Sequence, residues 1–321
     1  MSQLGPLRSP RRRRWLRRAA VGVVAVVAIL GLVVWRLGWW APPQYTPNAA
    51  VRVSGEILNS AGHDARVSRL GQGEYLLHIE ADAAPPGRGA LLFFGARHSK
   101  DPNHPQLAAL RQAWKEFKPT VALVEGRMSF FVGTPRQGIG IFGEGAAVYS
   151  LAEQHGIPLY TLEPPLSIEI AALDDCGDRT QVAMFRVLSG YISARRGGPV
   201  SDFKIGRLLS RRAAPLTTAL PNIAALEQHF TAQFPELGPW RDLPEEAMWP
   251  GKTDTLLHRM ATRSNRVRDE HFVRTMLDLA QKGERVLAIA GRSHTITLEP
   301  MLLESMQPAH RGELSSARPW E

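Results

Sequence analysis

The sequence predicts an α/β fold: a mostly parallel sheet with helices on both faces, a helical insert, and one N-terminal transmembrane helix. Three observations predict it. Short apolar runs alternate with segments of helical periodicity between residues 90 and 160. A last apolar run, RVLAIA, follows a long helical segment near the C-terminus. An uncharged apolar stretch follows a cluster of arginines near the N-terminus.

The N-terminal apolar stretch runs from Ala19 to Trp35 and has the composition of a membrane span. Its length corresponds to roughly 25 Å of helix, slightly less than a hydrocarbon core of about 30 Å. Extension to Trp40 closes this gap and places Trp39 and Trp40 at the membrane interface. We therefore expect a basic cytoplasmic tail (1–18), a transmembrane signal anchor (19–40), a linker (41–50) and an exported α/β domain (51–321).

The arginines before Ala19 predict the orientation of this anchor. Positive charge is retained on the cytoplasmic side, so we expect a single-pass protein of the inner (cytoplasmic) membrane with its C-terminal domain outside the cytoplasm. A cleaved signal peptide is the alternative. The length of the apolar stretch and the lack of a clean A-x-A site favour an uncleaved anchor.

The net charge of +9 does not indicate nucleic-acid binding, because it is concentrated at the N-terminus. Eight arginines and no Asp, Glu or Lys lie in residues 1–50, which leaves the rest of the chain almost neutral. A basic groove for phosphate backbones is therefore not expected. Cys176 is the only cysteine, which excludes an intramolecular disulfide.

The exported part has strand and helix patterns in alternation. GEYLLHIEAD is the best strand candidate in residues 51–82. Further strands are expected in ALLFF, TVALV, PLYTLEP and RVLAIA, and helices in HPQLAALRQAWKEF and GEGAAVYSLAEQHG, the second ending at Gly156. Residues 166–283 are mostly helical in pattern, ending in a long helix from about 254 to 282, and we expect the helices of this region to form an insert or a cap over the sheet.

Ionisable residues follow four of the predicted strands. His98 follows ALLFF, Glu125 follows TVALV, Glu163 follows PLYTLEP, and His294 follows RVLAIA. Ligand chemistry in a parallel sheet collects outside the carboxyl ends of its strands. We therefore expect these four side chains to meet at one edge of the sheet.

Each of these residues also has a structural interpretation. A single histidine after a strand is usually an ordinary hydrogen-bonded residue, and Glu163 could simply cap the turn before Pro164. The pairing of His98 and His294 favours a site, because these two of the ten histidines alone have Gly at the third position before them. Glu125, at the end of a buried strand, would be costly unless it were paired, ligated or protonated.

Charged residues elsewhere are candidates for the same edge. Arg268 and Asp269 lie in the last long helix and could point toward it, although exposed helical charges often form only a solvated face. Arg97 and Arg292 stand next to the two histidine motifs and could hold an anionic group of a substrate or form structural ion pairs.

The order of these motifs resembles the Tiki, TraB/GumN and ChaN superfamily, of which erythromycin esterase-like proteins are a distant branch. The resemblance covers about residues 88–300 and consists of G-x-x-H (His98), E-G (Glu125), R-D (Arg268 and Asp269) and a second G-x-x-H (His294). It implies an α/β fold with two histidines and a glutamate in one pocket. This sequence has Arg inside both G-x-x-H motifs, where small or neutral residues are commoner.

The resemblance and the residue types lead to a membrane-anchored hydrolase of peptides or esters as the first hypothesis. His98, His294 and Glu125 suit Zn²⁺, Mn²⁺ or Co²⁺ with an open position for water, or Glu125 is the general base and Glu163 a ligand. A metal-free esterase with one histidine as general base is the nearest alternative. A haem- or iron-complex-binding protein of the ChaN type and an inactive descendant are the others.

Overall fold

The computed structural model describes residues 10–70, 73–81, 89–251, 253–306 and 309–311. Within them, a six-stranded sheet has the order β6-β4-β7-β3-β2-β8. Its four parallel members are β3 (Ala90–Ala96), β4 (Val121–Val124), β6 (Leu159–Thr161) and β7 (Arg285–Gly291). The strands expected from the apolar runs are thus present and run in one direction.

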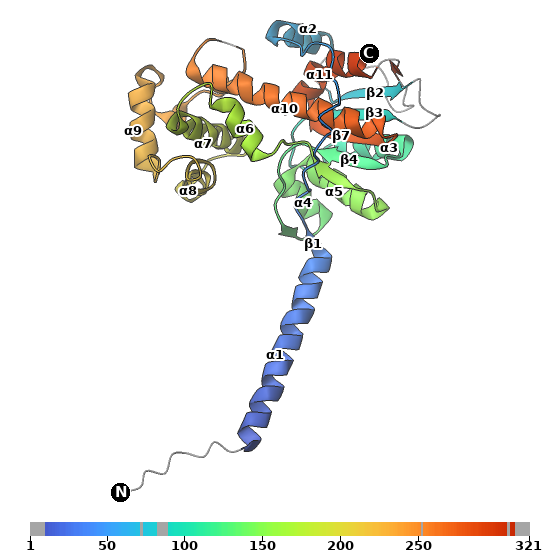
Figure 1. Ribbon diagram of the computed structural model, residues 1–321, viewed down its shortest axis with the longest axis vertical. Helices are drawn as coiled ribbons and strands as arrows, with labels where there is room; N and C mark the ends of the chain where they lie inside the picture. The colour runs from blue at the N-terminus through green and yellow to red at the C-terminus, as the bar shows by residue number, and fades with distance from the viewer. Residues whose placement is uncertain (1–9, 71–72, 82–88, 252, 307–308, 312–321) are drawn as a thin grey trace.

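The two faces of this sheet bury alternate side chains of the same strands. Leu91 and Phe93 of β3 pack on one face against α10 (Leu256–Gln281) and α11 (Arg292–Ser305). Leu92 and Phe94 point to the other face, which α3 (Gln106–Phe117) and α5 (Glu144–His155) cover. Burial on both faces explains why β3 is a continuous apolar run rather than an alternating one. The prediction of helices on both faces is confirmed (Figure 1).

One edge of the sheet departs from the parallel arrangement. β2 (Tyr75–Ala81) pairs antiparallel with β3, and β8 (Ala309–Arg311) pairs antiparallel with β2. β2 lies at the strand predicted in GEYLLHIEAD. The helix α2 (Ser60–Leu70) precedes β2 and lies against α11. Arg66 of α2 forms an ion pair with Glu299 of α11 at 2.8 Å.

The residues between β6 and α10 form a helical unit with a hydrophobic core of its own. It consists of α6 (Leu166–Leu173), α7 (Arg179–Arg195), α8 (Asp202–Leu208), the π-turn η1 (Leu209–Ala213), α9 (Ile223–Gln233) and three 3₁₀ turns, η2 (Pro235–Leu237), η3 (Trp240–Asp242) and η4 (Glu245–Met248). Its core is separate from the two cores of the sheet. The expected helical insert is therefore present.

The helix α10 belongs to both units. Leu257 and Met260 in its first turns pack in the core of the helical unit, whereas Phe272 and Met276 pack on the sheet. Figure 1 shows α10 running from the helical unit across the sheet. The middle of α10 is thereby fixed at the boundary between the two units.

The N-terminal helix α1 (Pro10–Leu37) contains one segment, Ala19–Arg36, that is long and apolar enough to cross a membrane. None of that segment is buried, and α1 projects away from the rest of the molecule (Figure 1). The helix ends at Leu37, earlier than the boundary at residue 40 that we expected.

The chain passes directly from α1 into the folded domain. Gly38 and Trp39 form β1, which pairs antiparallel with β5 (Phe131–Val132), and the helix α4 (Pro135–Phe142) follows β5. Trp39 is buried and stacks on Tyr149 of α5 with ring centroids 5.0 Å apart. The expectation that Trp39 lies at the membrane interface is wrong, because its side chain is buried in a core of the sheet domain. Trp40, the next residue, is about half exposed. The sequence does not show that these two neighbouring tryptophans have different environments.

The segment 41–50 makes specific contacts, although we expected a linker. The backbone of Thr161 donates to the carbonyl of Pro43, and the hydroxyl of Tyr45 donates to Asp278 at 2.7 Å. These contacts hold the segment against β6 and α10.

Candidate active site

The carboxyl ends of the four parallel strands lie side by side, and the predicted residues meet there. The His98 Nε2 lies 3.9 Å from one oxygen of Glu125, and the His294 Nε2 lies 3.5 Å from the other. Arg268 then joins Glu125 to Glu163. All four residues that follow the strands therefore lie within one connected cluster, as the sequence predicts.

The glycines of the two G-x-x-H motifs are required by close packing. A Cβ on Gly291 would lie 2.7 Å from the His98 Nε2, and a Cβ on Gly95 would lie 2.9 Å from the hydroxyl of Thr295. Both distances are too short for real side chains, so any larger residue would displace a neighbour. Gly291 thus leaves the space that the His98 ring occupies beside Glu125.

Both histidines are oriented by a carboxylate at Nδ1. The His98 Nδ1 lies 2.6 Å from Glu144, and the His294 Nδ1 lies 2.6 Å from Asp269. A carboxylate can only accept, so Nδ1 carries the proton in each ring and Nε2 points toward Glu125. Asp269 was a predicted site residue, whereas Glu144 was not.

The two histidines differ in environment. The side chain of His98 is 57% exposed, and its hydrogen bond to Glu144 raises its pKa above the ordinary value. The side chain of His294 is only 16% exposed. Burial opposes its charge, but Glu125 and Asp269 outweigh burial and raise the pKa of His294 to about 10. At neutral pH His294 is therefore a fixed cation.

Glu125 is held as a carboxylate by donors on both of its oxygens. The Arg268 guanidinium donates to one oxygen at 2.9 Å, and the backbone N–H of Gly291 donates to the other at 2.6 Å. Burial favours the neutral acid, but His294 and Arg268 overcome it and hold the pKa of Glu125 well below its usual range. Glu125 is thus ionised at all physiological pH values.

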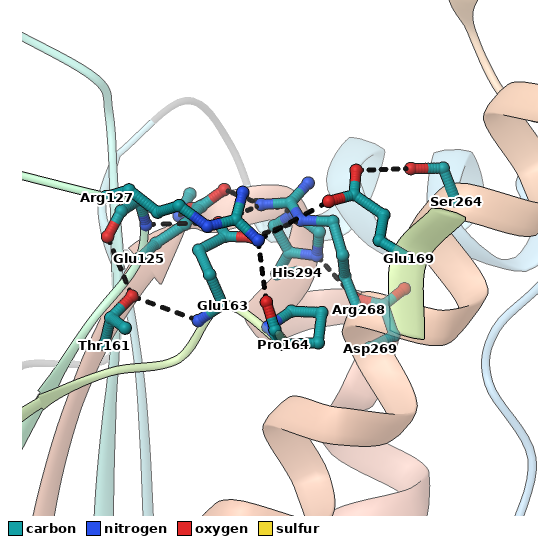
Figure 2. Close-up of polar contacts among 12 residues, drawn as sticks. Glu125, Arg127, Thr161, Glu163, Pro164, Glu169, Ser264, Arg268, Asp269 and His294 are labelled. Carbon is teal, nitrogen blue, oxygen red and sulfur yellow. Dashed lines mark hydrogen bonds and ion pairs between the residues drawn. The ribbon is translucent and has the colours of Figure 1, made fainter. Parts of the chain in front are cut away.

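Arg268 and Glu163 form a second ion pair behind Glu125. The guanidinium donates to both oxygens of Glu163, at 2.7 and 2.9 Å, as Figure 2 shows. The pKa of Glu163 is lowered, since Arg268 outweighs the effect of burial. Glu163 is also an acceptor for the backbone N–H of Gly126 at 3.2 Å. Glu163 therefore does more than cap the turn before Pro164, because it also fixes the position of Arg268.

The helical unit reaches this cluster through α6. Arg127, two residues after Glu125, donates to the carbonyl of Pro164 at 2.7 Å and lies 3.5 Å from Glu169 of α6 (Figure 2). Glu169 also lies 3.6 Å from the buried Arg186 and accepts from Ser264 at 3.4 Å. The sequence does not single out these residues, because each is a common charged or polar residue of a helix or loop. Their contacts arise only from the packing of the helical unit against the sheet.

Arg97 and Arg292 lie near each other next to the two histidine motifs. The charge of Arg97, together with burial, lowers the pKa of the Arg292 guanidinium. Arg97 is exposed, and its backbone N–H and carbonyl are both bonded to the side chain of Gln106. Two guanidinium groups this close together form a locally positive surface, which suits an anionic group.

Glu144 is the main residue of the cluster that sequence reasoning missed. It is buried at the first position of α5, where an acidic residue also interacts favourably with the helix dipole. It lies 46 residues from His98 in the chain. The only signal in the sequence is an acidic residue between two glycines at the start of a helix. Such a residue is common at helix starts, so it does not indicate a functional site.

No family model, curated protein or solved structure matches this chain.

Proposed function

We propose that this chain is a membrane-anchored hydrolase that acts outside the cytoplasm on a small-molecule ester or a peptide, with His98 as its general base. The observation that carries the proposal is the geometry of His98. Its Nδ1 is bound to the buried Glu144, its Nε2 lies 3.9 Å from Glu125, and its side chain is 57% exposed. The resemblance to the Tiki and erythromycin esterase-like superfamily agrees with this assignment.

The proposed reaction begins with a water between His98 and Glu125. The 3.9 Å gap between the Nε2 and the carboxylate is too long for a direct hydrogen bond and allows one water to contact both groups. Neutral His98 takes a proton from this water as it attacks the carbonyl, and Glu144 stabilises the imidazolium that forms. The leaving group then takes the proton back from His98.

The buried ions hold this geometry without changing charge during the reaction. Glu125 stays ionised and His294 stays protonated near neutral pH, so neither is suited to exchange protons with a substrate there. We assign Glu125 the task of orienting the water, and Arg268 and Glu163 the task of fixing Glu125. Arg97 and Arg292 remain candidates for binding an anionic part of the substrate.

The donors in the cluster fit a divalent metal only in part. Two Nε2 atoms face one carboxylate, and each ring has a carboxylate at Nδ1, as metal-binding histidines usually do. Both oxygens of Glu125 already accept hydrogen bonds, however. Across the described residues, no group of three or more His, Cys, Asp or Glu is arranged to hold a metal ion. The mechanism above therefore uses no metal.

Haem binding would require a broad apolar slot at one of the histidines. The surroundings of His98 are instead rich in charge, with Glu125, Glu144 and the guanidinium of Arg268 in the same cluster. An apolar cavity of about 250 Å³ does occur, but it lies between Trp40 and Leu159. The hydrolase is thus better supported than the haem protein.

The membrane anchor is supported by what cleavage near residue 41 would remove. Such cleavage would take away β1 and the buried Trp39, which packs in a core of the sheet domain. An uncleaved α1 keeps these contacts. The orientation follows the arginines that precede Ala19.

The test uses the purified full-length protein with chromogenic esters and fluorogenic peptides as probes. His98→Ala should lower kcat/KM by roughly 10²–10⁴-fold, because it removes the general base. Combining it with Glu125→Gln should add little, since groups that act on one water are strongly non-additive. The control His229→Ala changes an exposed histidine of α9 and should leave activity intact.

Three results would contradict this proposal. Full hydrolytic activity in His98→Ala would remove His98 from the reaction. Activity that a chelator abolishes and Zn²⁺, Mn²⁺ or Co²⁺ restores would replace the metal-free mechanism by the metal-dependent one. A Soret band on stoichiometric haem addition, lost in His98→Ala and without any hydrolysis, would favour the haem-binding protein.

A further inference from the structure

The surface next to the end of α1 is apolar and exposed. Four large hydrophobic residues that are about half exposed lie there: Trp40, Phe130, Val132 and Ile141. Three of them belong to residues 126–143, which include β5 and α4 and which we call the lip. Figure 1 shows β1 and α4 on the side of the domain from which α1 projects.

This apolar surface is continuous with the exposed surface of α1. The ring of Phe130 lies against the end of the helix, where a Cβ on Gly38 would be 2.5 Å from that ring and 2.6 Å from the carbonyl of Val34. The rings of Phe130 and Trp40 are 4.7 Å apart. Val34 itself is exposed on the last turns of α1. One uninterrupted apolar surface therefore extends from the membrane-spanning segment onto the lip.

The charge of the lip also matches a membrane surface. Residues 126–143 contain two arginines, Arg127 and Arg136, and no Asp, Glu or Lys. Residues 37–50 contain no charged residue at all. No carboxylate would thus have to be desolvated or brought close to anionic headgroups when this part approaches a bilayer.

The lip is rigid enough to keep its apolar residues on the outside. Thr134 caps α4 with a capping box, and Gly138 packs so closely on Trp39 that a Cβ there would lie 2.2 Å from its ring. Ile139 is buried inward while Ile141 points outward. The exposure of Ile141 is therefore a property of the fold rather than of a loosely held helix.

We propose that the lip, together with Trp40, lies in the interface of the same lipid bilayer that α1 crosses. Its aromatic residues and Ile141 bury apolar surface among the headgroups and upper acyl chains, where amphipathic and aromatic side chains are favoured. The lip joins Glu125 to Glu144, so the bilayer would directly contact the segment between two residues of the proposed active site.

The test places a nitroxide label at single cysteines in the full-length chain in a Cys176→Ser background. Phe130→Cys and Ile141→Cys probe the lip, and Ala65→Cys, on the exposed side of α2 away from α1, is the control. The protein is reconstituted in vesicles of phosphatidylcholine and phosphatidylglycerol. At 130 and 141 we expect collisions with oxygen to exceed those with a water-soluble nickel chelate several-fold, and the reverse at 65.

Two outcomes would overturn this inference. Labels at 130 and 141 that meet the nickel chelate as readily as the label at 65 would place the lip in water. Labels shielded from both oxygen and nickel would indicate a protein partner instead of lipid. The inference rests on the proposed anchor, and flotation of the vesicles separates the two: a protein that floats with the vesicles and has a water-exposed lip refutes the lip alone.

Discussion

The two G-x-x-H histidines share a local sequence but not a local chemistry. Both have Nδ1 on a carboxylate and Nε2 toward Glu125. His294 is enclosed by Glu125 and Asp269 and stays charged, whereas His98 is open to solvent on one side. A group that must gain and lose a proton near neutral pH needs a pKa close to that range. In the proposed hydrolase His98 is therefore the candidate for proton transfer, because His294 stays charged near neutral pH.

The pH dependence of hydrolysis should report on His98 and its partner Glu144. The general base must be neutral, so activity should rise with pH through a pKa above the ordinary histidine value of 6.5, because Glu144 raises it. Glu144→Gln removes that carboxylate and should move the acid limb of the kcat/KM profile to lower pH while reducing its plateau. Glu153→Gln, on the exposed side of the same helix, is the control and should leave the limb in place. An acid limb that does not move in Glu144→Gln would show that another group titrates.

The strands and helices that surround the cluster explain which parts of it the sequence predicts. β3, β4 and β7 are apolar runs because both of their faces are covered, and the polar residue after each is easy to locate. The convergence of His98, Glu125, Glu163 and His294 follows once these strands are parallel. Glu144 could not be predicted in this way, since its role depends on how α5 packs and not on the pattern around it.

Other elements were missed because their signals depend on tertiary contacts. β1 and β5 have two residues each and exist only through their pairing with each other. α2 has no buried residue, so it lacks the periodic apolar positions that predict a helix. The antiparallel direction of β2 is not encoded in its own apolar residues, which fit either direction.

The turn from β7 into α11 offers a test at the level of these elements. Gly291→Ala introduces a Cβ 2.7 Å from the His98 Nε2 and should push the ring from its place beside Glu125. The backbone at Gly291 has an ordinary φ of −55°, so the fold should persist. We expect kcat/KM to fall by about 10²-fold or more, as the loss of general-base catalysis requires, with circular dichroism unchanged.

The matched control is Gly206→Ala in α8. A Cβ there would contact nothing within 4 Å, and alanine in a helix stabilises by up to about 1 kcal/mol. Activity in Gly206→Ala should equal that of the unmodified protein. Equal activity in both variants would show that the position of the His98 ring is unimportant for hydrolysis.

In the molecule as a whole, the N-terminal helix α1 is joined to the domain at Trp39, directly after the helix. The residue stacks on Tyr149, contacts Phe131 edge-on and belongs to a core of the sheet domain. Trp39→Ala should lower the free energy of unfolding by about 3–5 kcal/mol. The melting temperature in detergent should fall by on the order of 10 °C.

Pro10→Ala serves as the comparison for Trp39→Ala, because it lies at the far end of α1 and should leave the melting temperature of the domain unchanged. A domain that melts at the same temperature with and without the Trp39 side chain would contradict this role of Trp39. N-terminal sequencing of the mature protein adds a second measurement: a chain that begins near Ala41 would show that the domain folds without β1.

For the proposed anchor, the direct passage from α1 into β1 has a consequence for how the domain can move on a membrane. A protein tethered by a flexible segment samples a hemisphere of positions, with a radius that grows as the square root of the tether length. Here β1 pairs with β5 at the very next residue after α1, and the segment that follows is bonded to β6 and α10. Once α1 spans a bilayer, rotation about the membrane normal is the main freedom left to the domain. The strand ends that carry His98 and Glu125 would then work at one constant height above the lipid, and the distance of a substrate's reactive bond from the membrane would itself become a criterion of selection.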